Sequence, residues 1–255
     1  MTLRLSLALM ILAMMPLAQA RASEANAPEL PRQSWSFDGP FGTYDKAALQ
    51  RGFKVYRDVC SSCHSMNLLY YRDLEGIGYN EAQIKNIAAD YTIEDGPNDE
   101  GDMFERPRLP SDHFKAPFAN AKAAAYANNG AAPPDLSLIA KAREGHADYI
   151  YALLTSFQNP PPHGANLAQG QYWNEYFPGH KLAMPPPLSD GMVAYEDGTP
   201  ETLNQYARDV AQFLTWAGDP YMEERKRTGL KVLLFLLVFA SVMYAVKRKI
   251  WADQH

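Results

Sequence analysis

The chain has 255 residues, a formal net charge of −5 and only two cysteines. Two cysteines exclude a multi-disulfide scaffold and a four-cysteine metal site. Residues 22–224 carry 15 Lys and Arg against 28 Asp and Glu, a net charge of −13, which disfavours nucleic acid and suits either a basic protein partner or simple solubility.

The first 22 residues predict a secretory signal peptide. Arg4 precedes an apolar run over residues 5–17, and small residues at 18–22 provide an A-x-A cleavage site. The apolar run is short for a membrane-spanning helix. We therefore expect residues 23–228 to be exported as one domain, a length that supports a single hydrophobic core.

Residues 45–59 predict an amphipathic helix. Apolar side chains recur there at three- and four-residue steps: Leu49, Phe53, Tyr56 and Val59. This spacing places them on one helix face. Gly52 lies four residues before Tyr56 on the same side, where it would let another backbone approach.

The segment Cys60-Ser61-Ser62-Cys63-His64 follows that helix and has the C-x-x-C-H spacing of c-type haem attachment. Each thiol can form a thioether with a haem vinyl group, and the histidine can ligate the iron. A thioredoxin-like redox pair would need a βαβ context, and a zinc site would need two further ligands at close spacing. We predict one covalent haem c on Cys60 and Cys63, with His64 as the proximal ligand.

An acidic segment lies downstream of the haem motif. It holds six acids in twelve residues: Glu94, Asp95, Asp99, Glu100, Asp102 and Glu105. Such a segment can steer a basic protein by long-range attraction. A flexible, solvated loop explains the same composition nearly as well.

The second axial iron ligand must come from elsewhere in the exported domain. Its methionines are Met66, Met103, Met184, Met192 and Met222. Met66 lies too close to His64 in the chain to reach the opposite face of the haem. Met222 lies next to the apolar C-terminal segment over residues 229–246, which we expect to enter the membrane. Met184 opens a Met-Pro-Pro-Pro run, in which the fixed φ of proline stiffens a ligand loop. Met184 is therefore favoured, with Met103 as the alternative.

Two further helices are predicted, over residues 147–157 and 201–217. The second has one apolar face, Thr199 or a neighbour as its cap, and an end at Gly218-Asp219-Pro220. Strand signals are few, and prolines and glycines cluster in the connecting segments. The predicted fold is mainly α with long loops, similar to class I cytochrome c.

Residues 229–246 are apolar except for Lys231. Eighteen helical residues rise about 27 Å, close to the thickness of the hydrocarbon layer. We predict a transmembrane helix over 229–247 and a cytoplasmic tail over 248–255, because Lys247-Arg248-Lys249 fits the positive-inside rule. Arg225-Lys226-Arg227 opposes this rule, and we expect these residues to meet lipid headgroups or a neighbouring subunit.

Several motifs together resemble the cytochrome c1 family of cytochrome bc1 complexes. Residues 51–56 run into the haem motif as they do in that family. The other matching motifs are Asp95-Gly96-Pro97-Asn98, Asn128-Asn129-Gly130-Ala131, Pro133-Pro134-Asp135-Leu136-Ser137, Lys141-Ala142-Arg143, Met184-Pro185-Pro186-Pro187 and Asp197-Gly198-Thr199-Pro200. Some relatives have an extra cysteine pair before the methionine ligand. This chain lacks it, so prolines and the packing of Trp173 and Tyr176 must hold that loop.

The resemblance implies a redox subunit of a bacterial ubiquinol–cytochrome c reductase in the cytoplasmic membrane. It would accept electrons from the Rieske iron–sulfur protein, associate with cytochrome b and reduce a cytochrome c. His64 and Met184 would be the axial ligands, and Arg143 would meet a haem propionate. No acid–base or nucleophilic group is recognisable, so no catalytic residue is expected. A stand-alone membrane-anchored cytochrome, an oxidase subunit and a haem-binding assembly or sensor protein remain alternatives.

Overall fold

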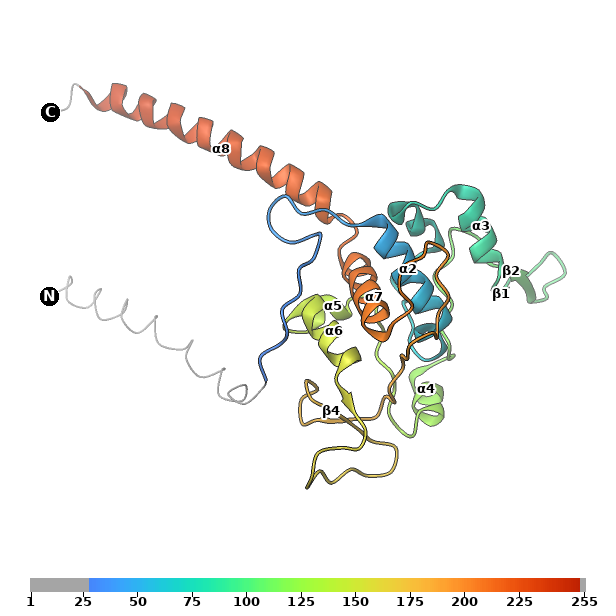
Figure 1. Ribbon diagram of the computed structural model, residues 1–255. Helices are drawn as coiled ribbons and strands as arrows, with labels where there is room; N and C mark the ends of the chain where they lie inside the picture. Colours follow the sequence, from blue (N-terminus) through green and yellow to red (C-terminus); the bar gives the residue numbers. More distant parts are fainter. Residues whose placement is uncertain (1–27, 253–255) are drawn as a thin grey trace, which may run out of the picture.

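A computed structural model describes residues 28–252, which form a helical head and one long helix that leaves it (Figure 1). The predicted signal peptide lies outside the described residues. The helices of the head are α2 (Lys46–Asp58), η1 (Cys60–Ser62), η2 (Tyr71–Ile77), α3 (Glu81–Ala89), α4 (Ala121–Ala127), α5 (Ile139–Ala142), α6 (His146–Thr155) and α7 (Leu203–Gly218). The long helix is α8 (Met222–Trp251). The mainly helical fold predicted from the sequence is confirmed.

The three helices predicted in the head are present, with small shifts at their ends. Asp45 caps α2 by accepting hydrogen bonds from the amides of Ala47 and Ala48 at 3.0 and 3.3 Å. The cap of α7 is Thr202, whose Oγ1 accepts from the Gln205 amide at 3.3 Å, so Thr199 does not fill this role. The predicted 147–157 helix ends at Thr155, because the chain then enters a strand.

Helices α2 and α7 cross at Gly52. A Cβ atom at this position would lie 2.1 Å from the Asp209 carbonyl oxygen and 2.7 Å from the Phe213 Cβ. The rings of Phe53 and Tyr56 lie 5.6 and 5.9 Å from the Phe213 ring. The glycine therefore permits the close backbone approach, and the aromatic side chains form the core around it.

A buried ion pair joins the same two helices. Arg51 donates to both carboxylate oxygens of Asp209, at 2.9 and 3.1 Å, and the Asp209 side chain is fully buried. Tyr195 and Gln205 each donate to this carboxylate at 3.0 Å. A buried carboxylate is stable only when its oxygens are paired in this way.

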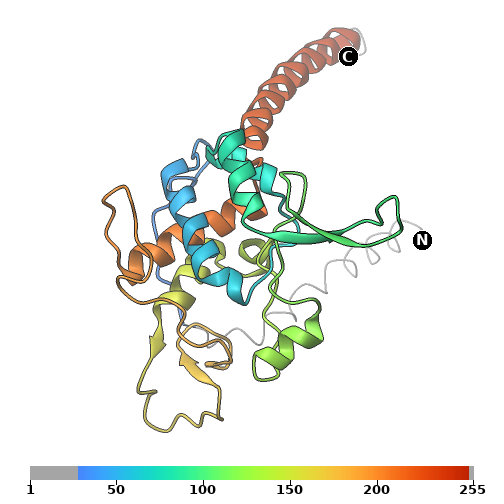
Figure 2. The same ribbon diagram turned by 90° about the vertical axis from the view of Figure 1, so that its right-hand side faces the viewer.

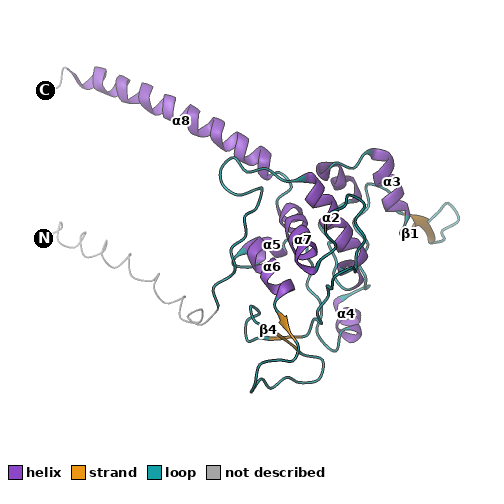
Figure 3. Cartoon of the chain, viewed as in Figure 1, coloured by secondary structure: helices purple, strands orange, loops and turns teal. Residues whose placement is uncertain are grey.

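Short strands were not predicted, and they lie at the edges of the head (Figure 3). One antiparallel hairpin pairs β1 (Thr92–Asp95) with β2 (Phe104–Pro107). A second sheet has the order β3 (Phe157–Gln158), β4 (Tyr172–Asn174), β5 (Lys181–Leu182). The acidic segment is thus a hairpin that extends away from the head (Figure 2), not a loop without secondary structure.

Helix α8 begins before the predicted span and ends beyond it. Its most apolar 18-residue window has a mean hydropathy of 2.2, and none of that window is buried. By length and composition, α8 is able to cross a membrane.

Candidate haem-binding site

The two cysteines and His64 lie in a tight turn that directly continues α2. The amides of Cys63 and His64 both donate to the Cys60 carbonyl, at 3.1 and 2.9 Å. The hydroxyl of Tyr56 donates to the His64 carbonyl at 3.2 Å, which ties the turn to the preceding helix. The two thiols do not form a disulfide with each other.

Cys60 is half-buried where α2 passes into the attachment turn. Burial, and then the nearby Cys63, raise the pKa of Cys60 to about 12. A redox-active cysteine pair usually has a thiolate of lowered pKa. The pair also lies between helices α2 and η2 and not in the βαβ context that the thioredoxin-like alternative would need.

The imidazole of His64 is oriented through one of its ring nitrogens. Its Nδ1 lies 2.8 Å from the carbonyl oxygen of Pro134, which can only accept a hydrogen bond. Nδ1 therefore carries the proton, and Nε2 keeps its lone pair for a metal. Burial lowers the pKa of His64, although the Pro134 carbonyl and Asp135 act in the opposite direction. A neutral, oriented imidazole fits the role of an iron ligand.

Asp135 positions the Pro134 carbonyl against the haem motif. Its carboxylate accepts hydrogen bonds from the Ser65 hydroxyl and from the amides of Asn67 and Ser137, each at 2.8 Å. Burial raises the pKa of this carboxyl, but the hydrogen bonds outweigh that effect and lower it overall. Sequence reasoning gave Asp135 no role. The Pro-Pro-Asp-Leu-Ser motif contained it, but the contact joins segments some 70 residues apart.

Met184 is half-buried and follows β5 by two residues. Four residues later, Leu188 belongs to the hydrophobic core at 5% exposure, so the proline run leads back into the head. Among the alternatives, Met66 is fully buried, while Met103 and Met192 are 54% and 52% exposed. The exposure of Met103 in the β1–β2 hairpin disfavours it as an iron ligand.

The loop before Met184 is held chiefly by Asn174. This buried side chain donates to the Leu153 carbonyl at 2.7 Å and accepts from the amides of Tyr176 and Phe177 at 3.2 Å. The Trp173 ring stacks on His180 with centroids 4.7 Å apart. Hydrogen bonds and stacking thus stabilise the loop without a disulfide.

Arg143 is exposed and follows the last residue of α5. Its guanidinium donates to the Ala142 carbonyl at 3.1 Å. Burial raises the pKa of Tyr149, and the nearby Arg143 charge acts against that rise. Within residues 28–252, no carboxylate pairs with Arg143. An exposed guanidinium without such a partner is compatible with binding of an anionic group such as a haem propionate.

The attachment turn also borders a cavity of about 270 Å³. Half of its lining residues are aromatic, and two are cationic: Phe53, Tyr56, Arg57, Ser61, Ser62, Tyr71, Tyr91, Phe114, Lys115 and Pro117. The Phe114 ring packs there against Phe53 and Tyr56 of α2, with ring centroids 5.9 and 6.2 Å apart.

Comparison with known proteins identifies the family. The family described as "Cytochrome C1 family" matches residues 35–254. This chain belongs to that family. It is 48% identical over 261 residues to "Cytochrome c1" of Rhodospirillum rubrum, which covers 96% of both chains. It is 43% identical over 235 residues to "Cytochrome c1, heme protein, mitochondrial" of Saccharomyces cerevisiae, covering 92% of this chain and 76% of that protein.

A further relative is "Cytochrome b/c1" of Bradyrhizobium diazoefficiens. It is 49% identical over 260 residues, which cover 94% of this chain but only 38% of the relative. This chain therefore spans about two fifths of that longer protein. Membership of the family implies a c-type haem cofactor and a role in respiratory electron transport, as the sequence motifs indicated.

Proposed function

We propose that this chain is the cytochrome c1 subunit of a bacterial ubiquinol–cytochrome c reductase. It accepts electrons from the Rieske iron–sulfur protein and passes them to a cytochrome c. The observation that carries the proposal is the oriented His64 within the C-x-x-C-H turn, in a chain that matches the family over residues 35–254. When bound, the haem supplies a one-electron redox centre.

The residues of the head would then hold and tune this cofactor. Cys60 and Cys63 attach it, and His64 and Met184 are the axial ligands. Arg143 neutralises a propionate. Asp135 and Pro134 fix the imidazole plane, and the α2–α7 core fixes the turn that carries both thiols.

The membrane topology is part of the proposal. Residues 1–22 direct export, residues 23–228 lie in the periplasm, α8 spans the membrane once, and residues 248–255 are cytoplasmic. Cytochrome b is the expected membrane partner, and the name of the Bradyrhizobium relative, "Cytochrome b/c1", supports the pairing. Co-purification of this chain with a b-type cytochrome and a Rieske protein tests the assignment against a stand-alone cytochrome.

Covalent attachment is tested by denaturing electrophoresis. We expect haem stain to follow the chain without residues 1–22, and to remain after extraction with acidified acetone. Cys60→Ala and Cys63→Ala should each leave at most one thioether and shift the reduced α-band, because each removes one bond to a vinyl group. Extraction of the parent haem by acidified acetone would contradict the assignment.

The acidic hairpin is proposed as a docking element for a basic cytochrome c. Asp95 pairs with Arg106, and Arg106 also pairs with Asp112 at 2.6 Å, so part of the acidic charge is used internally. Glu94, Asp99 and Glu100 lie exposed on the hairpin and make no such pairs among the described residues. These three carboxylates can attract a cation at long range.

We expect the rate of cytochrome c reduction to fall steeply as salt rises, since exposed charges are screened over ~8 Å at physiological ionic strength. Replacing Glu94, Asp99 and Glu100 by their amides should lower the low-salt rate at least about threefold and flatten its salt dependence. The matched control replaces Glu75, Asp90 and Glu196, exposed acids elsewhere on the head. If both triple variants behave alike, net charge and not the hairpin determines the rate.

A further inference from the structure

The backbone of Val193 is held by one side chain from another element. The Tyr206 hydroxyl of α7 accepts a hydrogen bond from the Val193 amide at 3.2 Å and donates one to the Val193 carbonyl at 2.6 Å. Tyr206 is fully buried and Val193 is 2% exposed. A single phenol thus satisfies both backbone polar groups of one residue inside the core.

Val193 belongs to the segment that follows the proposed iron ligand. Met184 lies nine residues before it, and the chain between them contains the proline run over 185–187 and the core residue Leu188. Proline fixes φ and favours a stiff, extended backbone. This stretch therefore transmits a shift of the segment at Val193 to Met184 instead of absorbing it.

Other contacts also hold this segment, but they lie at the surface. Asp190 accepts a hydrogen bond from the Leu203 amide at 2.6 Å. The Gly191 amide donates to the Glu201 carbonyl at 2.8 Å. Because Asp190, Gly191 and Glu201 are exposed, water can replace these bonds when they break. The Tyr206 hydroxyl has no such substitute, since its removal leaves a donor and an acceptor unsatisfied in the core.

The position of Tyr206 is itself fixed by packing. It lies in the first turns of α7, and α7 crosses α2 at Gly52. Its ring packs edge-on against the Tyr195 ring, with centroids 5.3 Å apart. Helix α2 runs directly into the turn that carries both thiols. The hydroxyl thus ties Val193 to the same pair of packed helices that supports the haem attachment turn.

We propose that Tyr206 is a positioning residue for the methionine ligand. Its hydroxyl fixes Val193, and the stiff segment that leads back to Met184 then keeps the thioether within reach of the haem iron. This role rests on the proposed haem function, with Met184 as an axial ligand. A thioether is a weak ligand, so a small outward shift of the segment opens the sixth position of the iron.

The test compares Tyr206→Phe with the parent, each as the full haem-loaded chain. Phenylalanine keeps the ring and its packing but removes both hydrogen bonds to Val193. We expect carbon monoxide to bind the ferrous haem at least about tenfold faster in the variant, because the sixth position is open in a larger fraction of the molecules. Flash photolysis or stopped-flow mixing measures this rate. The haem should remain covalently attached.

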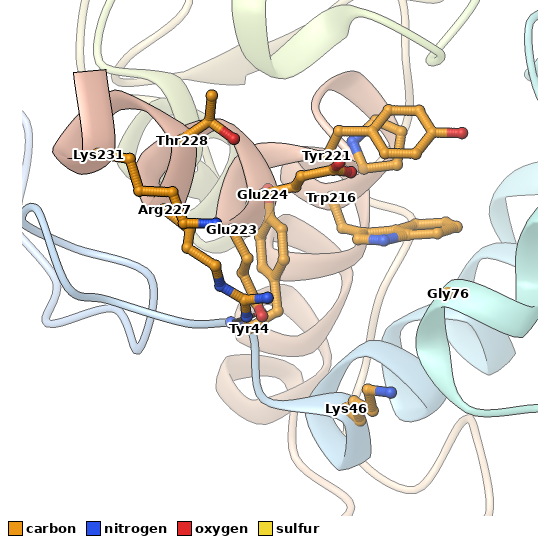
Figure 4. Close-up of a pocket in the computed structure, with 11 residues that line it drawn as sticks. Tyr44, Lys46, Gly76, Trp216, Tyr221, Glu223, Glu224, Arg227, Thr228 and Lys231 are labelled. Carbon is orange, nitrogen blue, oxygen red and sulfur yellow. Dashed lines mark hydrogen bonds between the residues drawn. The ribbon is translucent and has the colours of Figure 1, made fainter. Parts of the chain in front are cut away.

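The matched control is Tyr44→Phe, since the Tyr44 hydroxyl also donates to a backbone carbonyl, that of Asp219, at 3.0 Å. Figure 4 shows Tyr44 with other residues that line a cavity at the start of α8, among them Glu223 and Arg227. This variant should melt at a lower temperature than the parent but bind carbon monoxide at the parent rate. A purely structural role of Tyr206 would give the same result for Tyr206→Phe.

Hydrogen exchange of the parent tests the contact without any variant. We expect the Val193 amide to exchange as slowly as the buried amides of α7, because both need the core to open. Exchange of this amide at the rate of an unstructured peptide would mean that the Tyr206 hydroxyl does not hold the segment, and the proposal would be wrong.

Met184→Leu is measured in the same series, with the far-red charge-transfer band of ferric methionine-ligated haem as the readout. If this variant loses the band while Tyr206→Phe binds carbon monoxide at the rate of Tyr44→Phe, Met184 is the ligand and Tyr206 does not position it. If Met184→Leu keeps the band, another residue ligates the iron. The ligand assignment then fails together with the role of Tyr206.

Discussion

Met184→Leu is expected to lower the midpoint potential by on the order of 100 mV or more and to admit carbon monoxide to the iron. Leucine has nearly the same volume but no thioether, so the iron would lose its sixth ligand while the loop keeps its packing. Redox titration of purified membranes and the reduced-minus-carbon-monoxide spectrum measure the two effects. The haem should remain attached, because Cys60, Cys63 and His64 are unchanged.

Met103→Leu is the matched control for this experiment. Met103 was the alternative ligand, and its side chain is 54% exposed in the acidic hairpin. The control should keep the parent potential and exclude carbon monoxide. If Met103→Leu lowers the potential and Met184→Leu does not, the hairpin carries the ligand and the proline run is structural.

The sequence predicted long periodic elements better than short ones. Helices α2 and α7 were recognisable because each has one continuous apolar face over several turns. Helix α5 has four residues and strand β5 has two. Neither is long enough for a hydrophobic periodicity to be recognised in the sequence. Their positions depend on tertiary contacts that local propensity does not encode.

The haem site could likewise be predicted from the sequence only in part. Cys60, Cys63 and His64 form a local motif, and their spacing alone predicts attachment. The orientation of the imidazole depends on Pro134, whose carbonyl reaches His64 across 70 residues of sequence. Such a contact could be found from the sequence only through the family resemblance that included the Pro-Pro-Asp-Leu-Ser segment.

The basic residues in the first turns of α8 are another case in which the sequence alone is not enough. As a sequence, Arg225-Lys226-Arg227 is a uniform run of positive charge. In the structure, helical geometry directs neighbouring side chains about 100° apart, so each of the three has different surroundings. Lys226 donates to carbonyls of the segment before α2, Arg225 pairs with Asp219, and Arg227 lines a cavity between the start of α8 and the head. Their separate roles follow from the helix and not from the composition.

Gly52→Ala is expected to destabilise the head by about 3 kcal/mol or more, because overpacking a rigid contact costs typically 1–3 kcal/mol and sometimes more. The new methyl carbon would lie 2.1 Å from the Asp209 carbonyl oxygen, so α2 and α7 must separate. Alanine favours a helix by about 1 kcal/mol over glycine. A loss of stability in this variant would therefore report the cost of separating α2 from α7 and not a change in helix propensity. For a head of this size the melting temperature should fall by roughly 6–12 °C.

Gly229→Ala is the matched control, because this glycine is also helical and a Cβ there meets no atom within 4 Å. It should leave the melting of the head unchanged. The measurement follows the haem Soret band and the near-ultraviolet circular dichroism during heating. Separation of α2 from α7 moves the turn that carries both cysteines, so the Gly52 variant should also incorporate less haem during assembly. If Gly52→Ala melts like the parent with full haem content, the close crossing of the two helices does not limit the stability of this domain.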